Sequence, residues 1–372
     1  MKQPMVPENA EQDYFNSNPP PVALDEHKAL AQNFINAHAA SGNRLVLITS
    51  GGTIVPLEKR TVRFIDNFSA GTRGATSAEY FLEAGYAVIF LHRQFSLLPY
   101  SRHYSHATHC FLDFLHEGPD GKIIANEEYR EEMLMVIRKY NEAKEKKMLL
   151  TIPFVTVTDY LFTLRSVSQL MRPLAASGLL YLAAAVSDFF IPSERMPEHK
   201  IQSTGAVEML SAIGANSSKT VEKEDFDNFD SSPEVPRSKR LIVDLDPLPK
   251  FLKKLVEEWA PEGMIVSFKL ETDPDILIQK AQYSLERYQH HLVIGNLLAT
   301  RKSEVVFVAP GQEHRWIRTD STSANIEALN GEEKNQKLQS QNKSEIEKLI
   351  IPAIVELHDI HVERNKFLQS KP

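Results

Sequence analysis

The sequence predicts an α/β fold with a mostly parallel sheet that is covered by helices on both faces. Short apolar runs, such as 44–50, 87–93 and 149–154, recur along the chain and are bounded by turn residues. Such runs are typical of strands that are buried on both faces. Segments with helical periodicity separate these runs, and this alternation is characteristic of parallel β-α-β units.

The individual elements follow from the same patterns. The predicted strands, in chain order, are 44–50, the first part of 62–74, 87–93, 149–154, 179–187, 241–245, 264–270, 291–296 and 304–310. The predicted helices are one after residue 25, one that begins within 62–74 and runs through Leu82, then 126–146, 157–172, 249–259, 274–288 and a last one that begins near Ser344, where Glu347 three residues later matches a capping box.

Two stretches interrupt this alternation. Residues 214–238 are polar, acidic and poor in aliphatic side chains, which predicts a disordered insertion, and 319–343 are similar with fewer charges. Residues 1–25 are interpreted as a disordered N-terminal tail and 361–372 as a C-terminal tail. We therefore expect a single domain over 26–360 with loop insertions.

Composition and charge exclude several classes of protein. The 372 residues carry a formal net charge of −7 and show no basic stripe, which argues against a nucleic-acid partner. A single cysteine, Cys110, excludes a disulfide within the chain and fits a reducing compartment. Neither a signal peptide nor an apolar run of roughly 20 residues is present, so we expect a cytoplasmic protein that is also allowed in the nucleus.

Two glycine-rich segments point to a phosphate-bearing ligand. Residues 50–53 (Ser-Gly-Gly-Thr) follow a predicted strand directly, and Ser69-x-Gly71-x-x-Gly74 leads into a predicted helix. Glycines let the backbone approach a ligand closely, and a helix N-terminus favours anions. The alternative is that both loops only allow close packing of helix on strand. No GxxxxGK[ST] motif is present, which excludes a P-loop, and no acidic residue clearly fills the ribose position of a nicotinamide site.

The loop after the predicted strand 179–187 carries a second group of candidates. Small residues there make room for a flat ligand, and Asp188 follows them, where it could orient an amine or a hydroxyl. Lys200 lies in the stretch 196–203, which we expect to be a mobile loop that can close over a site. The alternatives are a turn residue for Asp188 and a solvated surface lysine for Lys200.

These pieces together resemble phosphopantothenoylcysteine synthetase of the eukaryotic type. The resemblance spans roughly residues 44–310 and is interrupted by the acidic insertion. It rests on several long strings in the same order, namely LITSGGTIVPLE (47–58), VRFIDNFSAGTRGATSAEYFLEAGYAVIFLHR (62–93), YLAAAVSDFF (181–190), MPEHKIQS (196–203) and SFKLETDP (267–274).

The resemblance implies a Rossmann-like fold, a homodimer and a ligase reaction in coenzyme A biosynthesis. The enzyme would join (R)-4′-phosphopantothenate to L-cysteine through an acyl-adenylate. Its eukaryotic character favours ATP over CTP as the co-substrate, although the residues themselves do not decide between them. Mg²⁺ is expected to be held by the phosphates rather than by a protein cage. Contacts with other enzymes of coenzyme A synthesis are left open.

The same resemblance assigns roles to particular residues. Asn67 is placed beside the acyl group, Lys200 on the flap that covers the intermediate, and Asp188 is a candidate for the base that deprotonates cysteine. Ala184 and Ala185 would line the phosphopantothenate pocket. Arg63 is assigned to the substrate, and like Arg73 it could pair with a phosphate or form an ordinary surface salt bridge. The implied nucleotide contacts are Gly51, Ser69, Gly71, Gly74, Phe268 and Asn296.

Other interpretations remain beside this one. A nicotinamide-dependent oxidoreductase has a similar fold, and a non-catalytic nucleotide-binding subunit or scaffold would need neither Asn67 nor Lys200. His103, His106 and His109, followed by Cys110, have a metal-like spacing. Since none of the resembling strings includes them, we interpret these residues as part of a loop, and no protein-held metal is predicted.

Overall fold

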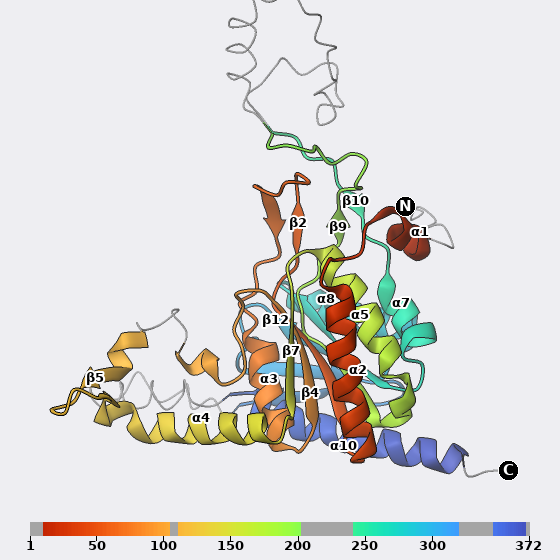
Figure 1. Cartoon of the computed structure of the whole chain (residues 1–372). Coiled ribbons are helices and arrows are strands. Elements are labelled where there is room, and N and C mark those ends of the chain that lie inside the picture. The colour runs from red at the N-terminus through yellow and green to blue at the C-terminus, as the bar shows by residue number, and fades with distance from the viewer. Residues whose placement is uncertain (1–9, 105–110, 202–240, 320–344, 370–372) are drawn as a thin grey trace, which may run out of the picture.

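A computed structural model of the chain describes residues 10–104, 111–201, 241–319 and 345–369 (Figure 1). Eight of its strands form one sheet within these ranges. Six neighbouring strands are parallel and two antiparallel strands extend one edge, which confirms the predicted α/β class with a mostly parallel sheet. The order across the sheet is β14 (Arg315–Arg318), β13 (Glu304–Val308), β12 (Leu292–Leu297), β11 (Met264–Glu271), β8 (Gly178–Leu182), β1 (Leu45–Ser50), β4 (Ala87–Arg93) and β7 (Leu149–Phe154).

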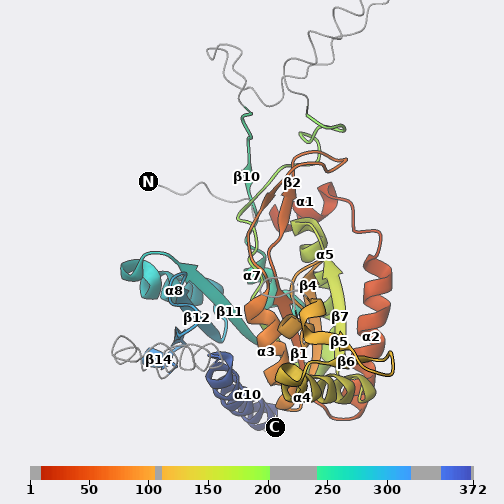
Figure 2. The same cartoon turned by 90° about the vertical axis from the view of Figure 1, so that its left-hand side faces the viewer.

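Helices cover both faces of the sheet. Leu45 and Leu47 of β1 share an apolar core with α2 (Leu24–Ala40) and α5 (Val157–Leu170). Val46 and Ile48 point the other way, into a core shared with α3 (Thr72–Glu83) and α10 (Glu347–Gln369). All six residues of β1 are buried, as expected of a strand covered on both sides. Figure 2 shows α8 (Pro274–Tyr288) and β12 at one end of the sheet and α2 and β7 at the other.

The order of the strands reverses at β1. The chain runs outward from β1 to β4 and then to β7, and it returns through α5 to place β8 on the opposite side of β1. In open α/β sheets, ligands bind outside the carboxyl ends of the strands at such a switch point. The loops that follow β1 and β8 are therefore the place to look for a site.

Smaller elements surround this edge and the outer surface. Figure 1 shows β2, β9 and β10 beyond the carboxyl ends of the sheet and α4 running outward from the body. The bounds are α1 (Ala10–Ser17), β2 (Ile54–Pro56), β3 (Phe64–Asp66), η1 (Ser101–Tyr104), η2 (Phe111–Phe114), β5 (Leu115–Glu117), β6 (Ile123–Ala125), α4 (Glu127–Glu145), η3 (Arg172–Ser177), β9 (Phe189–Phe190), β10 (Asp246–Pro247), α7 (Phe251–Lys254) and the π-helical η5 (Leu255–Trp259).

Both predicted tails need correction. Within 1–25, α1 is an ordered helix, because Tyr14 and Phe15 are buried and Phe15 packs edge-on against Phe162 and Trp259. At the other end, α10 continues through residue 361 to Gln369. Residues 1–9 and 370–372 lie outside the described ranges, and the single domain itself stays a prediction. Among the described residues, no helix is long and apolar enough to cross a membrane.

Two strand predictions were wrong in part. The strand predicted at 179–187 ends at Leu182, although single backbone bonds between Ala185 and residues 51–53 continue beyond it. The apolar run 241–245 forms no strand, since Val243 and Leu245 pack against the core without a partner strand. The predicted insertion 214–238 and Ser344 of the predicted capping box lie outside the described residues.

Three histidines in or near the interior, His290, His291 and His358, have strongly lowered pKa values. His358 bonds through Nδ1 to the Tyr86 hydroxyl and through Nε2 to the Ala176 carbonyl, both at 2.8 Å. His290 Nε2 lies 2.7 Å from the Ser267 hydroxyl. Burial lowers the pKa of His290, His291 and His358 from 6.5 to about 4, with smaller contributions from neighbouring charges on the last two. All three are therefore neutral at neutral pH.

These histidines should make the fold acid-sensitive. Each is neutral in the folded chain and protonates more readily when unfolded, so its stabilisation is complete above about pH 6.5 and is lost as the pH falls toward about 4. We expect the free energy of unfolding to drop by of the order of 2 kcal/mol per histidine between about pH 7 and about pH 5. Denaturant titrations at both pH values measure this loss.

Histidine ring resonances followed by NMR provide the control for the pH experiment. The rings of His290, His291 and His358 should titrate only below about pH 5. The carboxylate of Glu79 does not contribute to the loss of stability between about pH 7 and about pH 5. Although burial alone would raise its pKa, His103 and Arg102 lower it to about 2. A stability that stays constant down to about pH 5 would contradict the prediction.

Candidate functional site

The loops after β1 and β8 are joined by their backbones, and we call residues 51–53 and 183–187 the β1–β8 junction. The Thr53 amide donates to the Ala185 carbonyl at 3.0 Å, and the Ala185 amide donates to the Gly51 carbonyl at 2.8 Å. The Thr53 hydroxyl, which is buried, accepts from the Ser187 amide at 3.0 Å. These bonds hold the two predicted glycine and alanine segments against each other at the switch point.

Asn67 lies directly beside this junction. Its amide N–H donates to the Thr53 carbonyl at 3.2 Å, and its side-chain Nδ2 is 3.5 Å from the Ala185 carbonyl, at the limit of a hydrogen bond. A Cβ on Gly52 would lie 1.6 Å from the Asn67 carbonyl oxygen. Only glycine at position 52 lets the two segments approach so closely. The structure thus brings Asn67 and Ala185, two predicted acyl-site residues, together.

The N-terminus of α3 meets the end of β1 on the other side of the junction. Gly71 is the N-cap residue at φ 82°, and no side chain in the described ranges caps the helix. A Cβ on Gly74 would lie 2.4 Å from the Ser50 hydroxyl oxygen, and that hydroxyl donates to the Gly71 carbonyl at 3.0 Å. Gly74 therefore allows the close packing of helix on strand that the sequence offered as the alternative to a phosphate site. The same close packing brings the first-turn amides of α3 to the carboxyl edge of β1, beside Gly51.

Phe268 lies on the same face of the sheet as α3. Its ring contacts Tyr181 edge-on with the centroids 5.1 Å apart, and the Arg73 guanidinium lies 5.8 Å from its centroid. Arg73 itself donates to the buried Glu347 carboxylate at 2.7 Å. Of the two alternatives for Arg73, the structure therefore shows an ion pair. Asn296, only 6% exposed, is aligned with the Leu270 position of the neighbouring strand β11.

A buried carboxylate joins the β2–β3 hairpin to the segment that contains Lys200. Glu58 is 0% exposed and accepts hydrogen bonds from the amides of Val62, Arg63 and Ile201 and from the Arg63 guanidinium. Burial alone would raise the pKa of Glu58, but these donors lower it below its ordinary value. Arg63 also donates to the Ile201 carbonyl at 3.0 Å. We call these contacts around Glu58 the Glu58 clasp. The Arg63 guanidinium is engaged in it, and a contact between Arg63 and the substrate stays a prediction.

The two remaining predicted catalytic side chains are exposed. The Asp188 carboxylate forms an ion pair with Lys250 Nζ at 2.9 Å. Lys200 lies next to Ile201, whose amide is bound by Glu58 at 3.2 Å. The exposed charge of Asp188 fits a residue that meets a ligand from solvent, but its role as a base stays a prediction.

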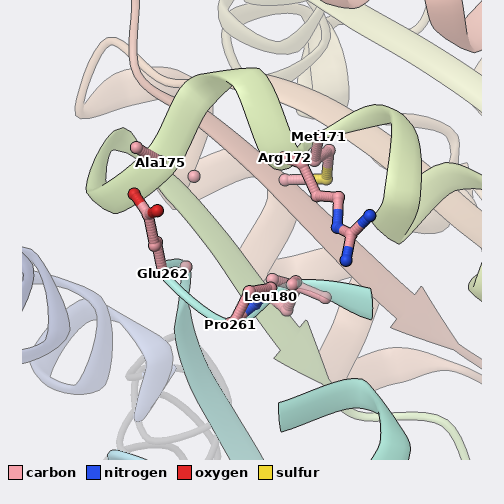
Figure 3. A pocket seen from close by; sticks show the side chains of 9 residues that line it. Met171, Arg172, Ala175, Leu180, Pro261 and Glu262 are labelled. Carbon is pink, nitrogen blue, oxygen red and sulfur yellow. The ribbon is translucent and has the colours of Figure 1, made fainter. Parts of the chain in front are cut away.

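Other hollows and clusters lie away from these residues. A cavity of about 260 Å³, lined by Met171, Arg172, Leu180 and Glu262 among others, lies near the start of β8 (Figure 3). It includes no predicted site residue. In the part of the chain that the structure describes, no three His, Cys, Asp or Glu side chains are placed to hold a metal ion. His103 bonds to Glu79 at 3.1 Å, whereas His106, His109 and Cys110 lie outside the described residues.

Sequence reasoning missed three residues of this region. Glu58 and Thr53 occur inside the resembling string 47–58, but nothing in that string shows that they bind distant backbone. Ser96 belongs to no motif, yet a Cβ on Gly71 would lie 3.3 Å from its hydroxyl oxygen. Only contacts between segments far apart in the chain reveal these three.

Comparisons with known proteins identify close relatives. No protein-family model matches the chain. The chain is 46% identical over 367 residues to phosphopantothenate–cysteine ligase CAB2 of Saccharomyces cerevisiae, which covers 98% of this chain and 90% of that protein. It is 39% identical over 316 residues to phosphopantothenate–cysteine ligase of Homo sapiens, which covers 84% of this chain and 90% of that protein.

Solved structures agree with these sequences. The structure of a Cab2 mutant matches with a TM-score of 0.77 at 44% identity, and it covers 96% of this chain and 99% of that chain. A Cab2 mutant in complex with phosphopantothenate-cysteine also matches with a TM-score of 0.77 at 44% identity, and it covers 95% of this chain and 99% of that chain. Fold and sequence thus point to the same set of proteins.

The junction geometry predicts a sharp effect of one methyl group. Gly52→Ala places a Cβ on the Asn67 carbonyl, so we expect Asn67 to be displaced and the turnover of the enzyme to fall by about 100-fold or more. Steady-state kinetics of the purified variant measure the loss.

Gly178→Ala is the matched control for Gly52→Ala. A Cβ at Gly178 would have its nearest neighbours at 3.5 Å, an ordinary contact, and its φ of −88° suits alanine. This variant should keep its turnover. A fully active Gly52→Ala enzyme would contradict the geometry described for the junction.

Proposed function

The chain belongs to the phosphopantothenate–cysteine ligase family, and we propose that it drives this ligation with ATP through an acyl-adenylate intermediate. A carboxylate is a poor acyl donor, because its leaving group would be oxide. Attack of the phosphopantothenate carboxylate on the α-phosphorus of ATP releases pyrophosphate and forms the acyl-adenylate. The cysteine amine then attacks the acyl carbon, loses a proton and displaces AMP, and phosphopantothenoylcysteine results.

The observation that carries this proposal is the β1–β8 junction. On one side it meets the N-terminus of α3, where Gly71 leaves the first-turn amides without a side-chain cap. On the other side it holds Asn67 against Ala185. An anionic nucleotide and an acyl chain bound at these two places would meet at one point, as adenylation of the carboxylate requires.

The proposed roles follow the same division. Gly51, Ser69, Gly71 and Gly74 would lie along the phosphates, and Phe268 and Asn296 along the rest of the nucleotide. Asn67 would fix the acyl carbonyl, with Ala184 and Ala185 along the pantothenate chain. Lys200 would offer its charge to the developing oxyanion, and the Glu58 clasp would hold the neighbouring Ile201. Asp188 is the proposed proton acceptor for the cysteine amine.

We propose that Mg²⁺ arrives with the triphosphate. The guanidinium groups near the glycines are already engaged, Arg73 with Glu347 and Arg93 with Asp66. No described cluster of acidic side chains provides a cage for the ion. Bound to the phosphates, Mg²⁺ would neutralise charge that the backbone amides only partly offset.

We also propose a homodimer that forms through the outer arm of the molecule. This arm consists of the β5–β6 hairpin and α4, which runs outward from the body (Figure 1), while Val136 and Ala143 of α4 still pack against it. Large apolar side chains are exposed on it, namely Leu134, Met135, Ile137, Tyr140, Ile123 and Ile124. Several exposed large apolar side chains on one arm are typical of an interaction site. A second copy of the chain would cover it.

Two wider expectations complete the proposal. Free cysteine is the co-substrate and must be reduced, so the reaction fits the cytoplasm, with access to the nucleus. Other enzymes of coenzyme A synthesis are proposed as partners, because the product is an intermediate that a further enzyme must consume.

An assay of pyrophosphate and AMP tests the reaction. The purified protein is mixed with ATP, Mg²⁺ and 4′-phosphopantothenate, with and without L-cysteine. We expect pyrophosphate in both mixtures, and AMP with the amide product only when cysteine is present. Lys200→Ala should keep ATP binding and lose turnover by about 10²–10³-fold, because an oxyanion contact is removed. Lys146→Ala changes an exposed lysine just after the end of α4 and should leave turnover unchanged.

Each competing function has its own outcome in this assay. No pyrophosphate with either ATP or CTP would favour a nucleotide-binding scaffold over a ligase that uses either nucleotide. A change in NAD(P)H fluorescence on mixing would favour the oxidoreductase, and we expect none. Unchanged turnover of Lys200→Ala would show that the proposed role of this lysine is wrong.

A charge on the arm tests the dimer. Ile137 is 46% exposed on α4, and Ile137→Glu should weaken association by about 100-fold, because a carboxylate would be buried in an apolar interface. Sedimentation velocity measures the oligomeric state. Val22→Glu, at a fully exposed position between α1 and α2, is the control and should leave the dimer intact. A monomeric wild type, or a dimer unaffected by the change at Ile137, would contradict the proposal.

A further inference from the structure

The turn that follows β4 lies against the glycines of the β1–β8 junction. Three backbone bonds hold this turn in place. The Gln94 amide donates to the Phe154 carbonyl at 2.8 Å, the Ser96 amide to the Arg93 carbonyl at 3.0 Å, and the Leu97 amide to the Ala70 carbonyl at 3.0 Å. The last bond ties the turn to the loop that precedes α3. Ser96 therefore has a position fixed relative to the N-terminus of that helix.

Ser96 approaches two of the predicted nucleotide glycines. A Cβ on Gly51 would lie 3.3 Å from the Ser96 Cβ, and a Cβ on Gly71 would lie 3.3 Å from the Ser96 hydroxyl oxygen. Both glycines also have positive φ angles, 84° and 82°, which other residues rarely adopt. The missing side chains leave the Ser96 hydroxyl beside the backbone that the site presents to a phosphate.

The Ser96 hydroxyl lacks a hydrogen-bond partner among the described residues. Its oxygen is buried, and no hydrogen-bonding group among the described residues reaches it. A buried hydroxyl left without a hydrogen bond costs about 1–3 kcal/mol, so such a group needs an explanation. The simplest explanation here is a bound ligand that supplies the missing hydrogen-bond acceptor.

The residue before Ser96 supports the same view. Phe95 has a φ of 68° while its side chain is 96% exposed, so burial of the ring does not offset this backbone conformation. A bulky residue in this region costs of the order of 1–2 kcal/mol. The turn keeps a strained residue and thereby places Ser96, not Phe95, against the glycines.

We propose that the Ser96 hydroxyl donates a hydrogen bond to a phosphate oxygen of the bound nucleoside triphosphate. This inference rests on the proposed function and adds a ligand-binding residue to it. The nearby cations are engaged, since Arg93 pairs with Asp66 and Arg73 with Glu347. Neutral donors therefore remain for the phosphates, namely the first-turn amides of α3 and the hydroxyl of Ser96.

Ser96→Ala tests the proposal, because it removes only the hydroxyl. A lost hydrogen bond to a charged phosphate should weaken the binding of ATP with Mg²⁺ by about tenfold or more in calorimetry. The KM for ATP should rise while the KM for phosphopantothenate stays the same. The melting temperature without ligand should be unchanged or higher, since an unpaired buried hydroxyl has been removed. A residue with a merely structural role would not separate these readouts.

Ser168→Ala is the matched control. Ser168 is 0% exposed and its hydroxyl likewise lacks a partner among the described residues, but it lies in the last turn of α5, which leads to the start of β8 rather than to its carboxyl end. This variant should bind ATP as the wild type does. Equal ATP affinity of Ser96→Ala and wild type would overturn the inference, as would a wild type that binds no ATP. A wild type that binds ATP, is weakened by Ser96→Ala, and yet releases no pyrophosphate would support the phosphate contact and refute only the reaction.

Discussion

The backbone contact between the loops after β1 and β8 is the constraint on which the rest of the site depends. Ala185 bonds to both Gly51 and Thr53, and it does so at the one place where the strand order reverses. Because these bonds join backbones, the Asn67 side chain takes no part in them, and its Nδ2 reaches the Ala185 carbonyl only at 3.5 Å. The close approach of Gly52 to Asn67 then sets the distance between the acyl side and the phosphate side of the site. A displacement at this contact would misplace both halves together.

A second feature is the way in which charges around the junction are used. Glu58 binds Arg63, Glu347 binds Arg73 and Asp66 binds Arg93, so each nearby guanidinium has an acidic partner. These pairs tie the hairpin, the last helix and the end of β4 to the site. The phosphates of a bound nucleotide would consequently meet backbone amides and hydroxyls, and this arrangement favours a ligand that brings its own cation.

Most strands could be predicted because a strand buried on both faces must be apolar along its whole length, as β1 is. The same pattern failed at 241–245, where only Val243 and Leu245 pack on the core, no strand of the described residues pairs with the run, and Leu241 and Ile242 are exposed. Helix α1 was missed for the opposite reason. Its eight residues are mainly polar, and it is ordered because Tyr14 and Phe15 reach a cluster of aromatic rings from other elements. Neither the missing strand at 241–245 nor the order of α1 can be recognised from the neighbouring residues in the sequence.

By itself, the sequence determined the α/β class, the glycine spacing before α3 and the resemblance to a ligase family, because periodicity and motifs are local properties of the chain. The tertiary structure alone decided that Arg73 pairs with Glu347, that Glu58 binds Ile201, and that the hydroxyl of Ser96 lies beside Gly71. Glu58 and Ile201 are 143 positions apart, and such a pair is invisible to any pattern of neighbours. Contacts of this range exist only after the sheet has brought its carboxyl ends together, so they had to be observed.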